Sequence, residues 1–195
     1  MNVEQGACPS EEEMKAEEAI GRRQAQAAAK AAAPKVPREE AEIVGLRVID
    51  AIKENLTHAL ICGSIRRGIE MVHDCDIVAV AHDDTAAESA MATLVSMGEP
   101  IRAGKKLASV RVEGVQVDLW LVPEESWGAS IMFATGSPQL NIRQRQMARR
   151  HGMVLSQYGL FTDNSAQTRI AGATEVEVYA ALGMAYLEPW ERSWG

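Results

Sequence analysis

The sequence predicts an α/β (α+β) fold, in which helices pack on a mixed sheet. Short apolar runs that suit strands alternate along the chain with longer segments whose apolar residues recur at helical spacing. The chain has 195 residues, of which 47% are hydrophobic. That is enough for one core, or for two small subdomains that share an interface.

The charge balance counts against a general nucleic-acid binder, because the net charge is −7 and the pI about 5.2. Carboxylates that hold a metal would add formal negative charge that bound cations cancel. Basic residues are instead concentrated in one segment, at Arg143, Arg145, Arg149 and Arg150.

Cysteine usage and hydropathy set the expected compartment. Three cysteines without metal-finger spacing predict a reducing, cytoplasmic setting; they are Cys8, Cys62 and Cys75. No apolar run approaches the roughly 20 residues of a membrane span, and no signal peptide is visible, so we expect no membrane association.

The elements follow in order. Residues 1–34, rich in Ala, Glu, Gln and Lys, are a solvated helix or a partly disordered arm, and both interpretations stay open. An amphipathic helix is predicted over Glu39–Leu56. Periodicity then predicts strands at Ala59–Cys62 and Cys75–Ala81 and a helix at Thr85–Met97. A hairpin is predicted from Leu107–Val112 and Val115–Val122.

The C-terminal part begins after a change of pattern at Glu124–Gly136, a predicted subdomain junction. A helix over Gln139–Arg150 is expected to end before Gly152, which is a C-cap signal. Short strands around Tyr158–Phe161 and a helix at Glu175–Leu182 complete the chain. We therefore divide the sequence into 1–34, 35–124 and 125–195.

Three aspartates carry the predicted chemistry. Asp74 and Asp76 lie two residues apart at the start of an apolar strand, so both point to one face. Asp118 lies within a second strand and completes a site for two Mg²⁺ ions, which Mn²⁺ could replace. Two ions about 3.5–4 Å apart promote in-line attack on a phosphoryl group. Solvated strand positions are the plainer alternative; the three together favour nucleotidyl transfer.

A glycine turn precedes these aspartates. Gly63 allows backbone N–H groups to approach phosphate oxygens closely, and Ser64 and Arg67 both donate to such oxygens. A surface turn is the alternative for this segment alone. Its position before an Asp-x-Asp strand favours a triphosphate site.

The arginines of Gln139–Arg150 could meet duplex phosphates and the minor groove. The plainer alternative is a solvated amphipathic face. The location of this helix, directly after Thr135-Gly136-Ser137, favours DNA.

Together these residues resemble the family X DNA polymerases, the group of DNA polymerase beta. The likeness runs from about Lys35 to the C-terminus, through the segments Gly63–Gly68, Asp74–Asp76, Val117-Asp118, Phe133–Ser137, Asn141, Tyr158–Phe161 and Tyr186–Pro189. It implies a nucleotidyltransferase palm over 35–124 and a small α/β thumb over 125–195.

The resemblance also implies roles. Asp74, Asp76 and Asp118 would be the catalytic, metal-binding triad. Nucleotide binding would fall to Gly63, Ser64, Arg67, Phe133, Ala134, Gly136 and Asn141, with Lys35 a weaker candidate. Asn141 would check the incoming base, and Arg145 would touch the template strand. Further DNA contacts would come from Arg143, Arg149, Arg150 and Tyr158.

Four departures from the family pattern are visible. His73 replaces a glycine, Val72 replaces a phosphate-binding polar residue of some relatives, and Gln116 stands where an arginine often contacts the catalytic aspartate. The sugar-facing pair, usually Tyr-Phe, is Phe133-Ala134. Because Ala134 leaves room for a 2′-hydroxyl, we expect weaker exclusion of ribonucleotides.

The sequence therefore predicts a monomeric, template-directed DNA polymerase that fills short gaps in DNA repair. It would add dNTPs to a primer 3′-hydroxyl in the cytoplasm, or in a host cytoplasm if the protein is viral. A template-independent terminal transferase, a ribonucleotide-tolerant nucleotidyltransferase and an inactive binding module are the alternatives. Residues 1–34 lack a helix-hairpin-helix pattern, so neither lyase activity nor processive synthesis is expected.

Overall fold

The structure is a computed structural model, and it describes residues 34–193. Apart from Pro34, the described residues lie within one compact unit, Lys35–Gly195. The arm expected over 1–34 lies outside the described residues, apart from Pro34. Along the described chain, no helix combines the length and apolar character that crossing a membrane requires.

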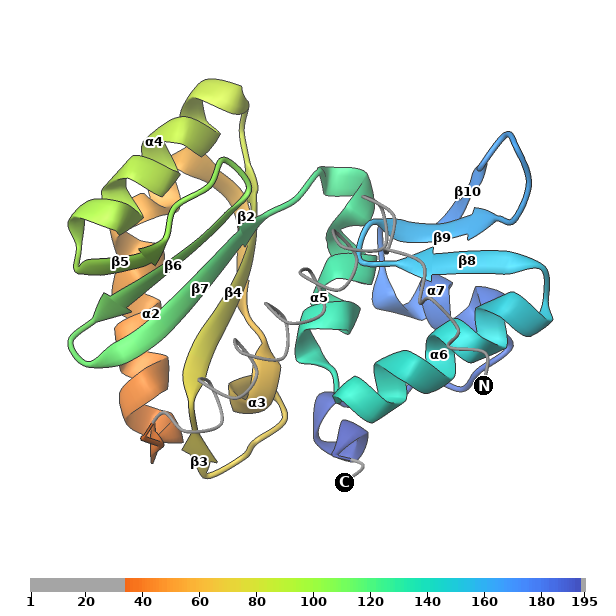
Figure 1. Cartoon of the computed structure of the whole chain (residues 1–195), viewed down its shortest axis with the longest axis horizontal. Coiled ribbons are helices and arrows are strands. Elements are labelled where there is room, and N and C mark those ends of the chain that lie inside the picture. Colours follow the sequence, from red (N-terminus) through yellow and green to blue (C-terminus); the bar gives the residue numbers. More distant parts are fainter. Residues whose placement is uncertain (1–33, 194–195) are drawn as a thin grey trace, which may run out of the picture. The chain divides into compact units, whose positions relative to one another are not determined.

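The first part of the described chain is built on a five-stranded sheet in the order β2-β4-β7-β6-β5 (Figure 1). Strands β4 and β7 pair in parallel, and the other neighbours are antiparallel. The strands are β2 (Leu56–Ile61), β4 (Asp74–Ala81), β5 (Glu99–Arg102), β6 (Leu107–Val112) and β7 (Val115–Leu121).

The two faces of this sheet have different environments. Helices α2 (Arg38–Ile52) and α4 (Asp84–Ser96) lie against one face, as Figure 1 shows. Alternate residues of the central strands, such as Ile77 and Leu119, fill the core beneath these helices and are fully buried. Because side chains alternate along a strand, the aspartates of β4 and β7 emerge on the opposite face.

Short elements connect these strands on the way to the aspartates. The 3₁₀ turn η1 (Lys53–Asn55) links α2 to β2, and α3 (Gly63–Arg66) follows β2 directly. Strands β1 (Val36–Pro37) and β3 (Met71–Val72) form a two-residue antiparallel ladder. This ladder brings the chain into β4.

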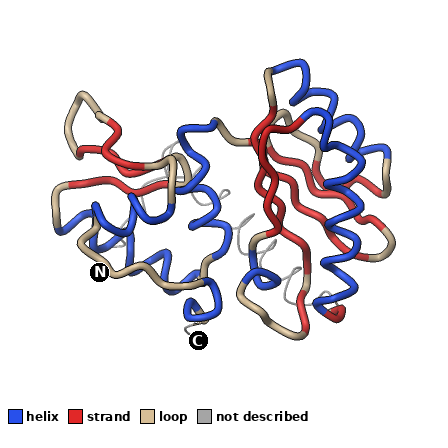
Figure 2. Tube along the Cα trace, turned by 180° about the vertical axis from the view of Figure 1, so that it is seen from behind, coloured by secondary structure: helices blue, strands red, loops and turns tan. Residues whose placement is uncertain are grey.

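The second part of the described chain has its own three-stranded antiparallel sheet, in the order β10-β9-β8. Figure 2 shows this sheet flanked by helices. Its elements are η2 (Glu124–Ser126), α5 (Trp127–Thr135), α6 (Pro138–Arg150), β8 (Met153–Ser156), β9 (Gly159–Thr162), β10 (Arg169–Ala171), α7 (Glu175–Ala181) and η3 (Pro189–Arg192). Its core includes Leu160, Tyr179 and Leu182, all essentially inaccessible to solvent.

Helix α5 belongs to both cores. Ile131 packs with Val78 and Val80 of the sheet, on the face that carries the aspartates. Ala129 and Met132 pack into the second core. The segment is therefore apolar on all sides, as expected for a helix covered on two faces.

The sequence-based elements were wrong at several boundaries. The helix predicted over Glu39–Leu56 ends at Ile52, and Leu56 begins a strand because its side chain packs into the sheet core. Cys62, predicted to end that strand, instead precedes the first turn of α3. Helix α5, strand β5 and turn η3 were not predicted; α5 lacks the amphipathic period, and β5 is exposed along its whole length.

Candidate active site

Three carboxylates meet on the face of the sheet opposite α2 and α4. Asp76 and Asp118 are direct partners in the parallel register of β4 and β7, and Asp74 lies two residues before Asp76. One oxygen of each carboxylate lies within 4.8 Å of the others. Asp74 is buried, at 4% exposure, and the other two are partly buried. Three oxygen donors at this spacing suit a hard divalent cation such as Mg²⁺ or Mn²⁺.

Gln116 holds Asp118 in place. Its Nε2 donates to both carboxylate oxygens of Asp118, at 3.0 Å to Oδ1 and 3.3 Å to Oδ2. In the sheet, Gln116 is also the partner of Asp74. An amide is neutral, so Gln116 orients the carboxylate without cancelling the negative charge that would attract a cation.

Gly63 lies in contact with this cluster. It has φ +62, and a Cβ built on it would lie 2.1 Å from Asp76 Oδ2. Just before it, the Cys62 N–H donates to the Asp76 carbonyl at 2.7 Å. Position 63 therefore requires glycine for two reasons: its positive φ, and the short distance between its backbone and the Asp76 carboxylate. Ser64 follows Gly63 directly in α3.

Arg67 lies between the carboxylates and the end of α5. Its Nη1 donates to the Thr135 carbonyl, and a Cβ on Gly136 would lie 3.3 Å from the same nitrogen. Burial lowers the pKa of Arg67, against the opposing effect of Asp76 and Asp74. Because an arginine stays protonated even so, Arg67 supplies a partly desolvated positive charge beside the carboxylates.

Phe133 and helix α6 form the next part of the site. Asn141 Nδ2 donates to the Phe133 carbonyl at 2.8 Å. The Arg145 guanidinium lies over the Phe133 ring, 5.8 Å from its centroid. Asn141 and Arg145 are one helical turn apart, so they share a face of α6. Ala134 follows Phe133 and packs against the apolar cluster to which Ile131 belongs.

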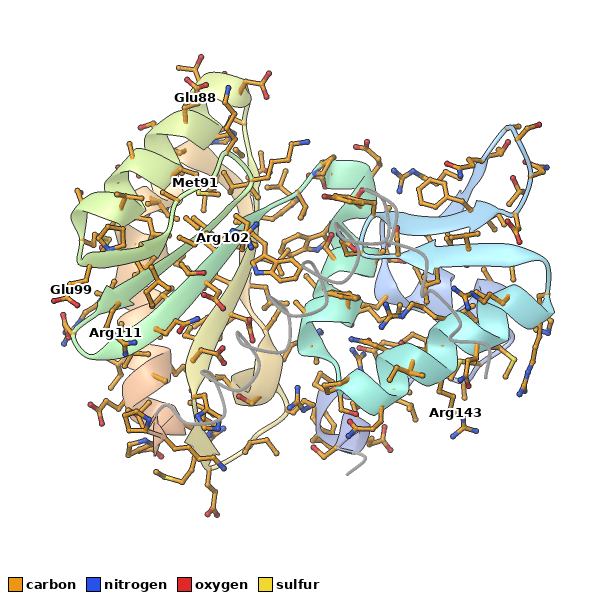
Figure 3. All side chains as sticks on the ribbon, viewed as in Figure 1. Glu88, Met91, Glu99, Arg102, Arg111 and Arg143 are labelled. Carbon is orange, nitrogen blue, oxygen red and sulfur yellow. The ribbon has the colours of Figure 1, made fainter. Side chains whose placement is uncertain are left out.

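The remaining predicted residues are not gathered at the carboxylates. Arg143 extends outward from α6 (Figure 3). Helical spacing puts Arg150 on the side of Arg143 and Arg149 on the side of Arg145, so the four arginines do not share one face. Tyr158 is exposed at the turn between β8 and β9, and Lys35 is exposed just before β1.

A buried ionic network beside the site was not predicted. Glu175, at the start of α7, accepts hydrogen bonds from Arg66 of α3 at 2.7 Å and from Arg192 of η3 at 2.6 Å. Burial alone would raise the pKa of Glu175, but hydrogen bonds from the two arginines outweigh it and hold the pKa below 4.5. In the sequence Arg66 is the neighbour of Arg67 in the glycine turn. No local pattern indicates that Arg66 pairs with Glu175.

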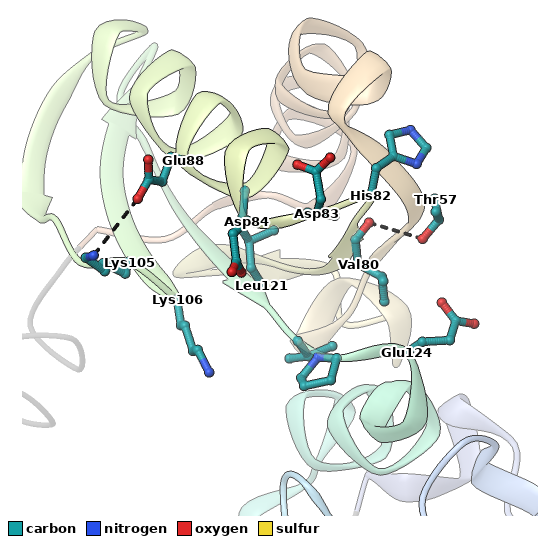
Figure 4. Close-up of a pocket in the computed structure, with 14 residues that line it drawn as sticks. Thr57, Val80, His82, Asp83, Asp84, Glu88, Lys105, Lys106, Leu121 and Glu124 are labelled. Carbon is teal, nitrogen blue, oxygen red and sulfur yellow. Dashed lines mark hydrogen bonds and ion pairs between the residues drawn. The ribbon is translucent and has the colours of Figure 1, made fainter.

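A surface pocket at the other end of β4 is separate from this site. It has a volume of about 570 Å³ and lies where β4 and β7 end, at the opposite end of β4 from Asp74 (Figure 4). Its rim carries charges of both signs, such as Lys106 and Glu124. None of the predicted site residues lines it.

Clustered carboxylates on a mixed sheet, next to a glycine turn with an arginine, are an arrangement that suits nucleotidyl transfer. Comparison with known proteins points in the same direction. Residues 130–193 match the family model for the DNA polymerase beta thumb. Similar curated proteins include DNA polymerase lambda of Rattus norvegicus, 28% identical over 82% of this chain, and the DNA polymerase/3'-5' exonuclease PolX of Bacillus subtilis, 30% identical over 77%. DNA nucleotidylexotransferase of Homo sapiens is 27% identical over 81%.

The chain is thus similar to DNA polymerases of family X, the family of DNA polymerase beta. The matched segment spans only part of each relative: 33% of the rat polymerase, 28% of the bacterial one and 40% of the human one.

Proposed function

We propose that the chain is a DNA-directed nucleotidyltransferase, which joins a dNTP to a primer 3′-hydroxyl and releases pyrophosphate, most suitably in short gaps of DNA. The observation that carries the proposal is the meeting of Asp74, Asp76 and Asp118 within 4.8 Å, next to a glycine turn. In this proposal residues 35–124 act as the palm and 125–195 as the thumb.

In this proposal, individual residues of the chain have separate roles in the reaction. Asp118 would accept the proton of the attacking hydroxyl, directly or through water, because Gln116 fixes its carboxylate in one orientation. Ser64 and Arg67 would bind the triphosphate, and Arg67 would also stabilise charge that develops on the leaving pyrophosphate. These roles are consistent with the position of Arg67 between the carboxylates and Gly136.

The carboxylates would hold two divalent cations, Mg²⁺ in the cell and Mn²⁺ as a substitute. Bound there, such ions supply charge neutralisation at the phosphates and lower the pKa of the attacking hydroxyl. The donor set supports this, since all three ligands are carboxylate oxygens and Asp74 is buried.

Template direction is supported by helix α6. Asn141 and Arg145 lie on one face of it and both contact Phe133, which suits a surface that inspects a base pair. Contacts to DNA phosphates at more exposed positions would come from Arg143, Arg149, Arg150 and Tyr158. A template-independent terminal transferase is the second candidate, because the human relative is a DNA nucleotidylexotransferase.

Sugar discrimination should be weak. Ala134 is small and packs against the apolar cluster. A 2′-hydroxyl therefore meets one large side chain of the pair, Phe133, instead of two. We expect measurable rNTP insertion, and strong exclusion of rNTPs would contradict this part of the proposal.

The test is single-nucleotide extension of a labelled primer with Mg²⁺, on a one-nucleotide gap and on a single strand. Extension by the complementary base alone, abolished in Asp118→Asn, is the expected result. Asp163→Asn, an exposed aspartate of the second part, is the matched control. Equal extension on the single strand, or indifference to the template base, would favour the terminal transferase.

A further inference from the structure

Trp120 is the next residue on the catalytic face of β7 after Asp118. The burial of β7 alternates, and Gln116, Asp118 and Trp120 are its half-buried positions. Trp120 is flanked in the sheet by Val78 of β4 and by Leu107 of β6. Its indole therefore lies on the same face of the sheet as the carboxylates.

The partner of this indole is Phe133. The two ring centroids are 5.9 Å apart, with an interplanar angle of 43°. This tilted arrangement lies within the range in which aromatic pairs attract each other. Trp120 and Ala134 pack against the same apolar cluster. Because Trp120 belongs to β7, its contact with Phe133 connects the ring of Phe133 to the sheet.

Phe133 is in turn the common anchor of the two α6 residues that face it. Asn141 donates to its carbonyl at 2.8 Å, and the Arg145 guanidinium lies 5.8 Å from its ring centroid. The void that adjoins Phe133, Asn141 and Arg145 measures about 10 Å³, room for one water at most. On the side of the sheet, Trp120 is the aromatic side chain that this ring contacts.

We propose that Trp120 is a positioning residue for nucleotide selection: it holds Phe133, and through Phe133 it fixes Asn141 and Arg145 against the nascent base pair. The inference rests on the proposed templated reaction. It assigns Trp120 no part in bond formation, because the indole offers neither a metal ligand nor a base to the reacting atoms. Its loss should relax the choice of nucleotide while catalysis on the correct one persists.

The chain offers a closely matched control. Trp127 packs against the same apolar cluster, but its ring contacts that of His58, at a centroid distance of 5.4 Å and an interplanar angle of 37°. Trp120→Leu and Trp127→Leu therefore remove the same side chain from the same cluster, and only the first removes the contact with Phe133. Trp120→Phe keeps an aromatic edge against Phe133 and guards against a variant that fails to fold.

The experiment measures kcat/KM for the complementary dNTP, for one mismatched dNTP and for the complementary rNTP, on gapped DNA. The energy of one aromatic pair corresponds to about a two- to tenfold change in each selectivity ratio. We expect Trp120→Leu to lower both ratios by this factor, Trp120→Phe to restore most of the loss, and Trp127→Leu to leave the ratios unchanged.

The outcomes separate the inference from the function on which it rests. Wild-type protein that extends no primer by template overturns the proposed function, and the inference with it. Wild-type protein that extends correctly, with unchanged ratios in Trp120→Leu, overturns the inference alone. Equal losses in Trp120→Leu and Trp127→Leu would also overturn it, because the effect would then come from general loosening of the cluster.

Discussion

Gln116 and Asp118 lie two residues apart on β7, and a single amide nitrogen of Gln116 contacts both oxygens of the Asp118 carboxylate. The spacing of two puts both side chains on one face of the sheet. An arginine would supply a stronger hydrogen bond but would also place a positive charge next to the cation site. The glutamine fixes geometry and leaves the charge of the site intact.

Gln116→Ala should lower the activity of the chain, because Asp118 loses its orienting partner. Removing a residue that orients a metal ligand typically costs about 10- to 100-fold in metal affinity or activity. Gln116→Arg should keep the orientation but raise the Mg²⁺ concentration needed for half-maximal primer extension. A Gln116→Ala protein with wild-type rate and wild-type Mg²⁺ dependence would refute the positioning role.

Gly63→Ala should separate steric conflict from backbone strain, with Gly68→Ala as its control. Both glycines have positive φ, but only the Cβ at position 63 meets Asp76; at position 68 there is open space. We expect both variants to lose about 1–2 kcal/mol of stability from the left-handed conformation. Gly63→Ala should in addition lose cation binding, measured by calorimetric titration with Mn²⁺. Equal cation affinity in the two variants would show that the collision is relieved without moving Asp76.

Glu175→Gln should destabilise the fold, because it leaves Arg66 and Arg192 without their counter-charge. Breaking a buried ion pair costs about 3–5 kcal/mol. The exposed substitution Glu99→Gln should cost about 0.5 kcal/mol or less. Urea denaturation followed by circular dichroism measures both, and a similar small loss in the two variants would argue against a buried network.

The same network predicts a pH dependence. The pKa of Glu175 is lowered in the folded state below the ordinary value of 4.5. Its stabilising contribution is therefore complete above that value and is lost as the pH falls through the folded-state pKa. Wild-type stability should decline with acid more steeply than that of Glu175→Gln, and parallel acid profiles would contradict the assignment.

The buried thiols should be unreactive. Burial raises the pKa of Cys62 to about 12 and also raises that of Cys75, so neither forms the nucleophilic thiolate near neutral pH. In a Cys8→Ser background, a colorimetric thiol reagent should label the native protein negligibly and both cysteines after denaturation. Rapid labelling of the native protein would indicate that the site opens readily to solvent.

Local pattern was sufficient to name the three carboxylates that meet in the structure, but not to predict their pairing. Asp74 and Asp76 stand out because two charges interrupt an apolar strand, and Asp118 because it occupies one face of an alternating strand. That Asp76 lies opposite Asp118 in a parallel ladder depends on register between distant segments, which the sequence does not encode locally. The prediction therefore named the clustered carboxylates without their geometry.

The elements that sequence reasoning missed are those whose stability is tertiary. Helix α5 is apolar on every side, so it shows no helical period. Glu175 resembles any acidic residue in the first turn of a helix, a favourable position in itself. Its burial is explained only by Arg66, which lies 109 positions earlier in the chain. Phe133, Asn141 and Arg145 were predicted as separate contacts, and their convergence required the structure.

Helix α5 contributes Ile131 to one core and Ala129 and Met132 to the other. A fragment cut before α5 would expose Val78 and Val80, and a fragment cut after it would leave the second core open. The two halves of the described chain are therefore not separable modules. They should unfold in a single cooperative transition, and recombination between relatives would preserve folding only where α5 is exchanged together with the surfaces that it covers.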